Sequence, residues 1–82
     1  MLKDTFREIM NKQGVGIAVL GRRMGVTMIK ANNRLSNANM TIRIMSELCK
    51  ALDYKVVLMP VSKKVPADCY DITMYAQEEG KE

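Results

Sequence analysis

Residues 12–43 carry six cationic side chains and contain neither Asp nor Glu. Acidic residues collect toward the two ends, at positions such as Asp4, Glu8, Asp68 and Asp71. A basic middle flanked by acidic ends is typical of a segment that binds a polyanion, although a solvated basic face without a ligand would carry the same pattern. The cations of this stretch are Lys12, Arg22, Arg23, Lys30, Arg34 and Arg43.

Catalytic and metal-binding chemistry have little support in the residue types of the chain. It has no histidine, its carboxylates are scattered, and its two cysteines, Cys49 and Cys69, lie far apart with no CxxC spacing. We therefore expect no enzyme activity, no metal site, no cofactor and no disulfide. Cys49 falls on the apolar stripe of a predicted helix, so we expect it to be a small buried residue.

Four helices are predicted from apolar spacing and capping residues, in a chain of 82 residues that has the length of a single domain. Thr5 and Glu8 have the spacing of a capping box at the start of the first helix, and Gly14 follows its end. The predicted helices cover residues 3–13, 17–24, 27–35 and 41–52.

The turn between the second and third predicted helices is the most specific feature of the sequence. Gly25 stands where a chain leaving a helix takes a left-handed conformation, and Thr27 is a good N-cap for the next helix. Gly21 suits a close crossing of the two helices because it has no side chain. On the third helix, the apolar positions expected to face inward are Met28, Ala31 and Leu35. The outward face then carries Ile29, Lys30, Asn33 and Arg34.

From Tyr54 onward the pattern changes from helical to extended. Residues 54–60 are rich in β-forming side chains and end at Pro60, and residues 69–75 alternate apolar with polar side chains. The two segments predict a β-hairpin whose strands are joined by a polar loop, residues 61–68.

The predicted organisation is one mainly α domain, residues 1–75, with four helices and a C-terminal β-hairpin, followed by a flexible tail, residues 76–82. The longest apolar run, residues 56–59, is far shorter than a membrane span, and the N-terminus is amphipathic rather than signal-like. We therefore expect a soluble cytoplasmic protein that has neither a membrane partner nor a small-molecule ligand.

Five short motifs occur in order along the chain: LGRRMGVT at residues 20–27, NRLSN at 33–37, NMT at 39–41, SELCKALDY at 46–54 and KVVLMP at 55–60. Together they resemble the lambda-repressor-like, or Xre and Cro, family of helix-turn-helix regulators, especially its short phage and mobile-element members. The resemblance extends from about Leu2 to Pro60. It implies a four-helix lambda-repressor-like DNA-binding domain whose third helix enters the major groove.

The resemblance also implies which side chains would touch DNA. Those expected near base edges are Thr27, Met28, Ile29 and Asn33. Asn33 would form two hydrogen bonds to adenine, and Thr27 and Ile29 would contact a thymine methyl group. Those expected at phosphates are Arg22, Arg23, Lys30, Arg34 and Arg43, together with the loop amides of Asn37 and Asn39.

Two functions are compatible with these residues. The first is sequence-specific binding of double-stranded DNA by a transcriptional regulator of phage or mobile-element origin. The alternative is a protein-interaction module, such as an antitoxin-like or phage accessory domain, in which Met28 and Ile29 form an apolar contact. Met28 could equally be a core residue, and Arg22, Arg23 or Arg43 could be solvated. Binding that weakens steeply with salt would favour DNA over a protein partner.

A homodimer is expected from the predicted hairpin. Both faces of residues 54–59 are largely apolar, and a single two-stranded ribbon in a small helical domain is marginal and leaves unpaired edges. A second copy that adds its strands through residues 54–75 would satisfy both. It would also place two recognition helices about 34 Å apart, as a pseudo-palindromic DNA site requires.

Overall fold

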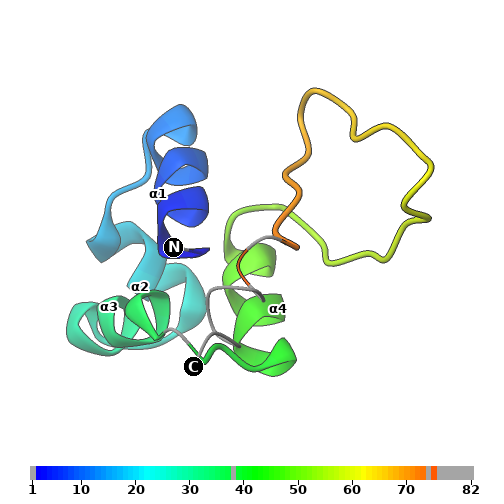
Figure 1. The fold of residues 1–82 in the computed structure, drawn as a ribbon. Helices are drawn as coiled ribbons and strands as arrows, with labels where there is room; N and C mark the ends of the chain where they lie inside the picture. Colours follow the sequence, from blue (N-terminus) through cyan, green and yellow to red (C-terminus); the bar gives the residue numbers. More distant parts are fainter. Residues whose placement is uncertain (1, 38, 74, 76–82) are drawn as a thin grey trace.

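The computed structural model describes residues 2–37, 39–73 and 75, and its regular structure is a set of four α-helices (Figure 1). The helices are α1 (Leu2–Gln13), α2 (Ile17–Met24), α3 (Met28–Ser36) and α4 (Ile42–Ala51). The prediction of four helices is confirmed, and each boundary lies within one residue of its predicted position. The predicted flexible tail, residues 76–82, lies outside the described residues.

Helix α1 has one apolar face, and its buried residues are Leu2, Phe6, Ile9 and Met10. The helix already includes Leu2, whose side chain is buried in the core, so the prediction that Thr5 caps the helix is wrong. Instead, Oγ1 of Thr5 lies 3.1 Å from the hydroxyl oxygen of Tyr75. The chain leaves α1 through Gly14, whose φ of 69° lies in the left-handed region that favours glycine.

The turn between α2 and α3 brings the two helix backbones close together. Gly25 has a φ of 73°, and its N–H donates to the carbonyl oxygen of Arg22 at 3.2 Å. Gly21 lies at the crossing, where a Cβ atom would be 3.0 Å from the carbonyl oxygen of Val26 and 3.3 Å from that of Thr27. Backbone atoms cannot turn aside as the end of a flexible side chain can. A larger residue at position 21 would therefore push α3 away from α2.

Threonine side chains begin α3 and α4 in the same way. Oγ1 of Thr27 accepts a hydrogen bond from the N–H of Lys30 at 3.2 Å, and Oγ1 of Thr41 accepts one from the N–H of Ile44 at 3.2 Å. Both threonines have the extended backbone that is usual at an N-cap. The start of α3 is therefore fixed by its own sequence, directly after the turn from α2.

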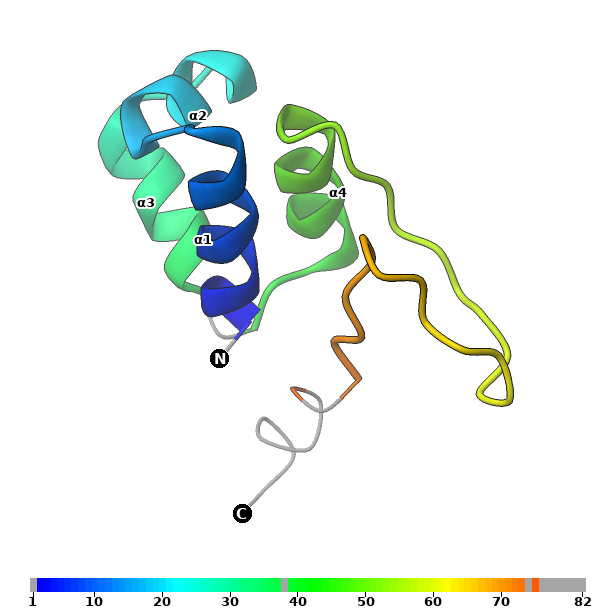
Figure 2. The ribbon, with the colours of Figure 1, turned by 90° about the horizontal axis from the view of Figure 1, so that it is seen from above.

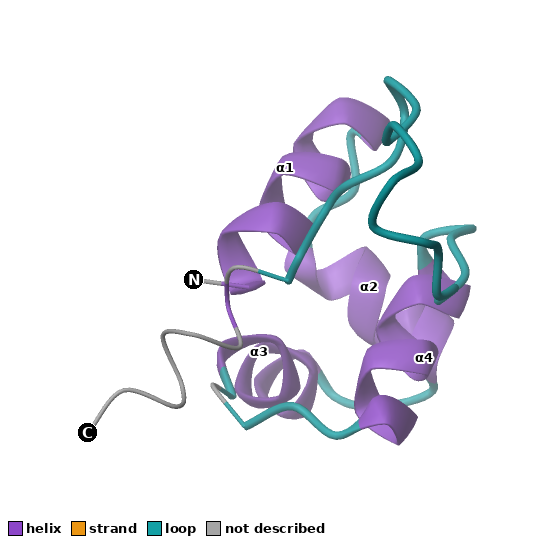
Figure 3. Cartoon of the chain, turned by 45° about the vertical axis from the view of Figure 1, so that its right-hand side comes forward, coloured by secondary structure: helices purple, strands orange, loops and turns teal. Residues whose placement is uncertain are grey.

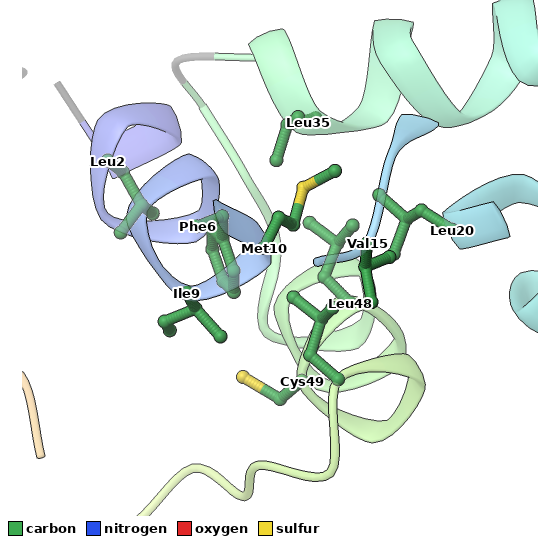
Figure 4. Packing of buried hydrophobic residues seen from close by; sticks show 10 residues of the cluster. Leu2, Phe6, Ile9, Met10, Val15, Leu20, Leu35, Leu48 and Cys49 are labelled. Atoms are coloured by element: carbon green, nitrogen blue, oxygen red, sulfur yellow. The ribbon is translucent and has the colours of Figure 1, made fainter. Parts of the chain in front are cut away.

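The core lies where the four helices meet. Its completely buried large side chains are four leucines from α2, α3, α4 and the residue after α4: Leu20, Leu35, Leu48 and Leu52. Figure 4 shows Phe6 and Met10 of α1 in the same cluster, between α3 and α4. Apolar packing therefore holds α3 from one side and leaves its opposite side at the surface.

The predicted C-terminal hairpin is not present in the described residues, because residues 54–73 contain no strand (Figure 3). They form a wide loop that leaves the helices and returns to them (Figures 1 and 2). Leu58 and Val61 in its outer part are fully exposed. β-branched side chains favour an extended backbone, but a strand also needs a neighbour with which to form hydrogen bonds. Among the described residues, the returning arm, residues 69–73, contacts α1 through Tyr70 and forms no backbone hydrogen bond with the outgoing arm, residues 54–60.

Tyr70 attaches the returning arm to α1. Nζ of Lys12 donates to the Tyr70 hydroxyl at 2.8 Å and lies 3.3 Å from Oε2 of Glu8. The hydrogen bond to Tyr70, and after it the contact with Glu8, raises the pKa of Lys12. The Tyr70 ring also packs against that of Tyr54, with 6.3 Å between the ring centroids. The two ends of the loop are therefore held together beside α1 and the end of α4.

Candidate nucleic-acid interface

Three residues on the outward face of α3 have the exposure that the sequence predicts. Ile29, Lys30 and Asn33 are exposed, and Ile29 keeps 71% of its surface. On the opposite side of the helix, Ala31 and Leu35 are completely buried. An apolar, a cationic and a carboxamide side chain therefore project together from a helix that is packed from behind.

The prediction that Met28 faces inward is wrong, because 52% of this residue is exposed. At this end of α3 the backbones of the two helices are in contact, since the Cα of Gly21 faces the carbonyl groups of Val26 and Thr27. That contact leaves no space for a long side chain between α2 and α3. Met28 therefore stays at the surface, next to Ile29.

Thr27 lies at the N-terminal end of the same face and is also exposed. Its Oγ1 accepts the hydrogen bond that caps α3, at 3.2 Å from the N–H of Lys30. A threonine hydroxyl can accept and donate at the same time, so the Thr27 hydroxyl keeps a hydrogen to donate to a ligand. The capping role and the predicted contact with a base edge are thus compatible.

The cations of α2 and α3 differ in their surroundings. Arg22 and Lys30 are exposed, and neither lies within ion-pair distance of a carboxylate in the part of the chain that the structure describes. Arg23 is exposed too, but its Nη1 donates to the carbonyl oxygen of Ala51 at 3.0 Å. Arg23 therefore links α2 to the end of α4, whereas Arg22 and Lys30 are better placed to meet an anion.

Arg34 does not project outward as the sequence predicts. Its Nη1 lies 2.9 Å from Oε1 of Glu47 on α4, and Oε2 of the same carboxylate lies 3.6 Å from Nε of Arg43. Two of the predicted phosphate contacts thus share one carboxylate. Glu47 follows Arg43 by four residues, a helical spacing that favours ion pairs, so the sequence carried a signal for that contact. The contact with Arg34 depends on how α3 packs on α4, for which the sequence carried none.

Asn37 and Asn39 lie in the exposed connection between α3 and α4. Oδ1 of Asn37 accepts a hydrogen bond from the N–H of Asn39 at 2.9 Å. Such a side-chain to backbone bond fixes the local course of a loop. Of the two predicted phosphate-contacting amides, this bond engages the Asn37 carboxamide oxygen, whereas Asn39 takes part through its backbone N–H.

A hollow between the C-terminal ends of α2 and α4 combines two cations with two carboxylates, and its lining residues are Arg23, Met24, Glu47, Lys50, Ala51 and Asp53. No group of three metal-binding side chains occurs among the described residues. Cys49 is buried as predicted, and burial raises the pKa of its thiol, whereas Cys69 is exposed.

Comparisons with known proteins give this chain no family. No protein-family model matches it, and neither a curated protein nor a solved structure does so. Within the described residues, none of the helices is long and apolar enough to cross a membrane. The function of the chain is therefore inferred from the side chains that α3 and its neighbours expose.

Proposed function

We propose that this protein binds double-stranded DNA sequence-specifically, with α3 in the major groove. The observation that carries the proposal is the exposed face of α3, where Ile29, Lys30 and Asn33 project from a helix whose other side is buried. The major groove admits an α-helix, and base edges there differ enough to be told apart by such side chains. Gly21 supports this arrangement because it lets α2 pack directly against the start of α3.

Each exposed side chain on this face has a chemical counterpart on a duplex. The carboxamide of Asn33 can accept a hydrogen bond from N6 of adenine and donate one to N7. Ile29 can pack against the methyl group of thymine, which gives a reason for the exposure of a large apolar side chain. Lys30 and Arg22 can neutralise phosphates, which positions the helix without reading sequence.

The charge pattern and the resemblance support the same proposal. The chain has a formal net charge of +4, and residues 12–43, which include α2 and α3, contain no acidic side chain. A cationic surface supplies the sequence-independent part of DNA binding. The resemblance to lambda-repressor-like regulators extends the proposal to a cytoplasmic regulator of transcription of phage or mobile-element origin.

One observation favours a different partner. Met28 and Ile29 are exposed side by side on α3, and large apolar side chains at a surface are also typical of protein-protein contacts. The second candidate function is therefore a protein-interaction module, antitoxin-like or phage accessory, that docks through these two residues. Such a contact would depend little on salt, since it neutralises no phosphates.

Selection of bound duplexes from a random pool tests the proposal directly. We expect a short consensus to emerge, and we expect the logarithm of the affinity for it to fall linearly with the logarithm of salt concentration. The slope should correspond to about 0.9 for each phosphate neutralised. A pool that stays random through successive rounds, with no salt-dependent retention of duplex, would contradict DNA binding and favour the protein-partner candidate.

A further inference from the structure

Glu47 occupies a distinctive place beside the cations of the candidate interface. Its two carboxylate oxygens face two different arginines, Arg34 of α3 at 2.9 Å and Arg43 of α4 at 3.6 Å. The side chains of Arg34 and Glu47 are 33% and 38% exposed, whereas that of Arg43 is 86% exposed. Among the described residues, no other carboxylate lies within ion-pair distance of a cation from α2, α3 or the start of α4.

A carboxylate in this position competes with phosphate for the same donors. Guanidinium groups bind carboxylates and phosphates through the same N–H groups and with the same geometry. With Glu47 beside them, Arg34 and Arg43 contribute a net charge of +1 to this surface, whereas the two arginines alone would contribute +2. A phosphate that approaches this surface therefore meets fewer free donors and one repelling charge.

We propose that Glu47 is an internal competitor of phosphate that limits sequence-independent binding of duplexes. The inference rests on the proposed function and assigns to the same surface a device that regulates its affinity. Sequence-independent binding comes almost entirely from phosphate neutralisation, so a residue that withholds two cations weakens it. Contacts of Asn33 and Ile29 with base edges do not depend on those cations. Glu47 therefore raises the ratio of the affinity for a specific DNA site to the affinity for a random duplex.

Arg34 and Arg43 contribute unequally to this device. The Arg34 pair is shorter and less exposed, and it joins α3 to α4, so we expect it to persist when a duplex binds. The Arg43 pair is longer and lies at the surface, where an exposed ion pair is weak and easily exchanged. Arg43 is therefore the cation that Glu47 releases to a phosphate first.

Neutral substitution of Glu47 tests the proposal on the full chain. We expect Glu47→Gln to bind a random-sequence duplex several-fold more tightly than the unsubstituted protein at the same salt concentration. The salt slope should become steeper by about one to two units as one or both arginines become free to meet phosphate. In the same variant, replacement of Arg34 by Gln should remove most of that gain, because Glu47 holds Arg34 more closely than Arg43, and replacement of Arg43 by Gln should remove a smaller part.

Glu8→Gln is the matched control, because it makes the same change of charge on α1 and also breaks an ion pair, that with Lys12. Circular dichroism of both variants would verify that the helices are retained. The effects of Arg34 and Arg43 are measured by comparing Glu47→Gln with the double variants that also carry Arg34→Gln or Arg43→Gln, so that all the chains compared lack Glu47. Equal affinities and slopes for Glu47→Gln and Glu8→Gln would overturn the inference while leaving DNA binding intact. If the unsubstituted protein binds no duplex at all, the inference falls together with the proposed function.

Discussion

Asn32 and Asn33 are neighbours on α3 with different surroundings. Asn32 accepts a hydrogen bond from Nη2 of Arg7 at 3.4 Å, whereas Asn33 lies on the face of α3 that carries Ile29. We expect Asn33→Ala to weaken binding to a selected duplex by about 1–3 kcal/mol and to change binding to a random duplex very little, because a base contact carries the discrimination. Equilibrium titration of both duplexes measures the two effects.

Asn32→Ala provides the comparison for that experiment. It removes the same side chain one residue earlier, where the carboxamide is already engaged with α1. We expect it to leave the preference for the selected duplex unchanged. If Asn33→Ala weakened both duplexes by the same factor, Asn33 would be a positioning residue that does not read bases.

The two cysteines differ in how far the fold exposes them. Burial raises the pKa of the Cys49 thiol above its ordinary value of 9.0, while Cys69 is exposed. A thiol-exchange reagent should therefore modify Cys69 much faster than Cys49, since the thiolate is the reacting form. Mass spectrometry of the partly modified protein identifies which cysteine reacted. Modification of both at the same rate would show that the site around Cys49 opens freely.

The raised pKa of Cys49 also sets the sign of a pH effect. The folded state favours the neutral thiol, so this contribution to stability is fully present below the unfolded pKa of about 9 and is lost as pH rises through the higher folded value. The free energy of unfolding should decline less steeply above pH 9 in Cys49→Ala than in the unsubstituted protein. A Cys49→Ala curve with the same shape as that of the unsubstituted protein would contradict the prediction.

At the scale of elements, Gly21 within α2 and Gly16 at its N-cap give opposite expectations. A Cβ at Gly21 would meet backbone atoms at 3.0 to 3.4 Å, whereas a Cβ at Gly16 would meet nothing within 4 Å. We expect Gly21→Val to destabilise the protein by about 1–3 kcal/mol, as overpacking usually does, and to loosen the α2–α3 crossing. Thermal unfolding, together with the loss of duplex binding, measures this effect.

Gly16 is the N-cap of α2 and makes no side-chain hydrogen bond there. Gly16→Ser would supply a hydroxyl to the first turn of α2, so we expect unchanged stability or a gain of a few tenths of a kcal/mol. The pair of substitutions separates the effect of adding a side chain from the effect of adding one at the crossing. Equal destabilisation by both would show that the close approach at Gly21 does not matter.

The helices could be predicted from the sequence because their limits are set by local chemistry. Gly14 and Gly25 end two helices through left-handed backbone, and Thr27 and Thr41 begin two others by capping. Features that depend on packing between helices could not be predicted in this way. The exposure of Met28 and the contact of Arg34 with Glu47 are of that kind, because helical periodicity gives a face without giving its neighbour.

The predicted hairpin is not present in the described residues, for a related reason. Residues 54–60 have the composition of a strand, but composition records a preference for extended backbone and does not supply a pairing partner. The hydrogen bond between Lys12 and Tyr70, at 2.8 Å, attaches the returning arm to α1 instead. For the candidate site, helical periodicity correctly predicted that Ile29, Lys30 and Asn33 are exposed, but it did not predict the contacts of Glu47 with Arg34 and Arg43.

At the scale of the whole molecule, the outgoing arm of the loop is the segment through which we expect a second copy of the chain to pair. Leu58 is fully exposed, and no backbone hydrogen bond involves residues 55–59 in the described part of the chain. Unpaired extended backbone with apolar side chains readily pairs with another chain. We expect a symmetric homodimer through this arm, which would set two copies of α3 about 34 Å apart on a pseudo-palindromic site. Sedimentation at micromolar concentration measures the mass.

Leu58→Lys separates association from folding. The side chain is fully exposed in the single chain, so the substitution should leave the helices intact while placing like charges in the dimer contact. We expect it to shift the protein to the 9.3 kDa monomer and to shorten the DNA footprint to one half-site. Ala67→Lys, also at an exposed position of the loop, is the control and should stay dimeric. An unsubstituted protein that sediments only as a monomer would contradict the homodimer.

The contact between Tyr54 and Tyr70 has a consequence for how this chain can vary. Because the centroids of the two rings lie 6.3 Å apart, the residues between them form a loop whose two ends meet at the same place on the four helices. The entropy of such a closure changes only with the logarithm of its length. Residues can therefore be inserted into this loop or deleted from it with little strain on α1 to α4. Outside residues 55–59, through which we expect the dimer to form, the loop can therefore change in length while α3 keeps its shape.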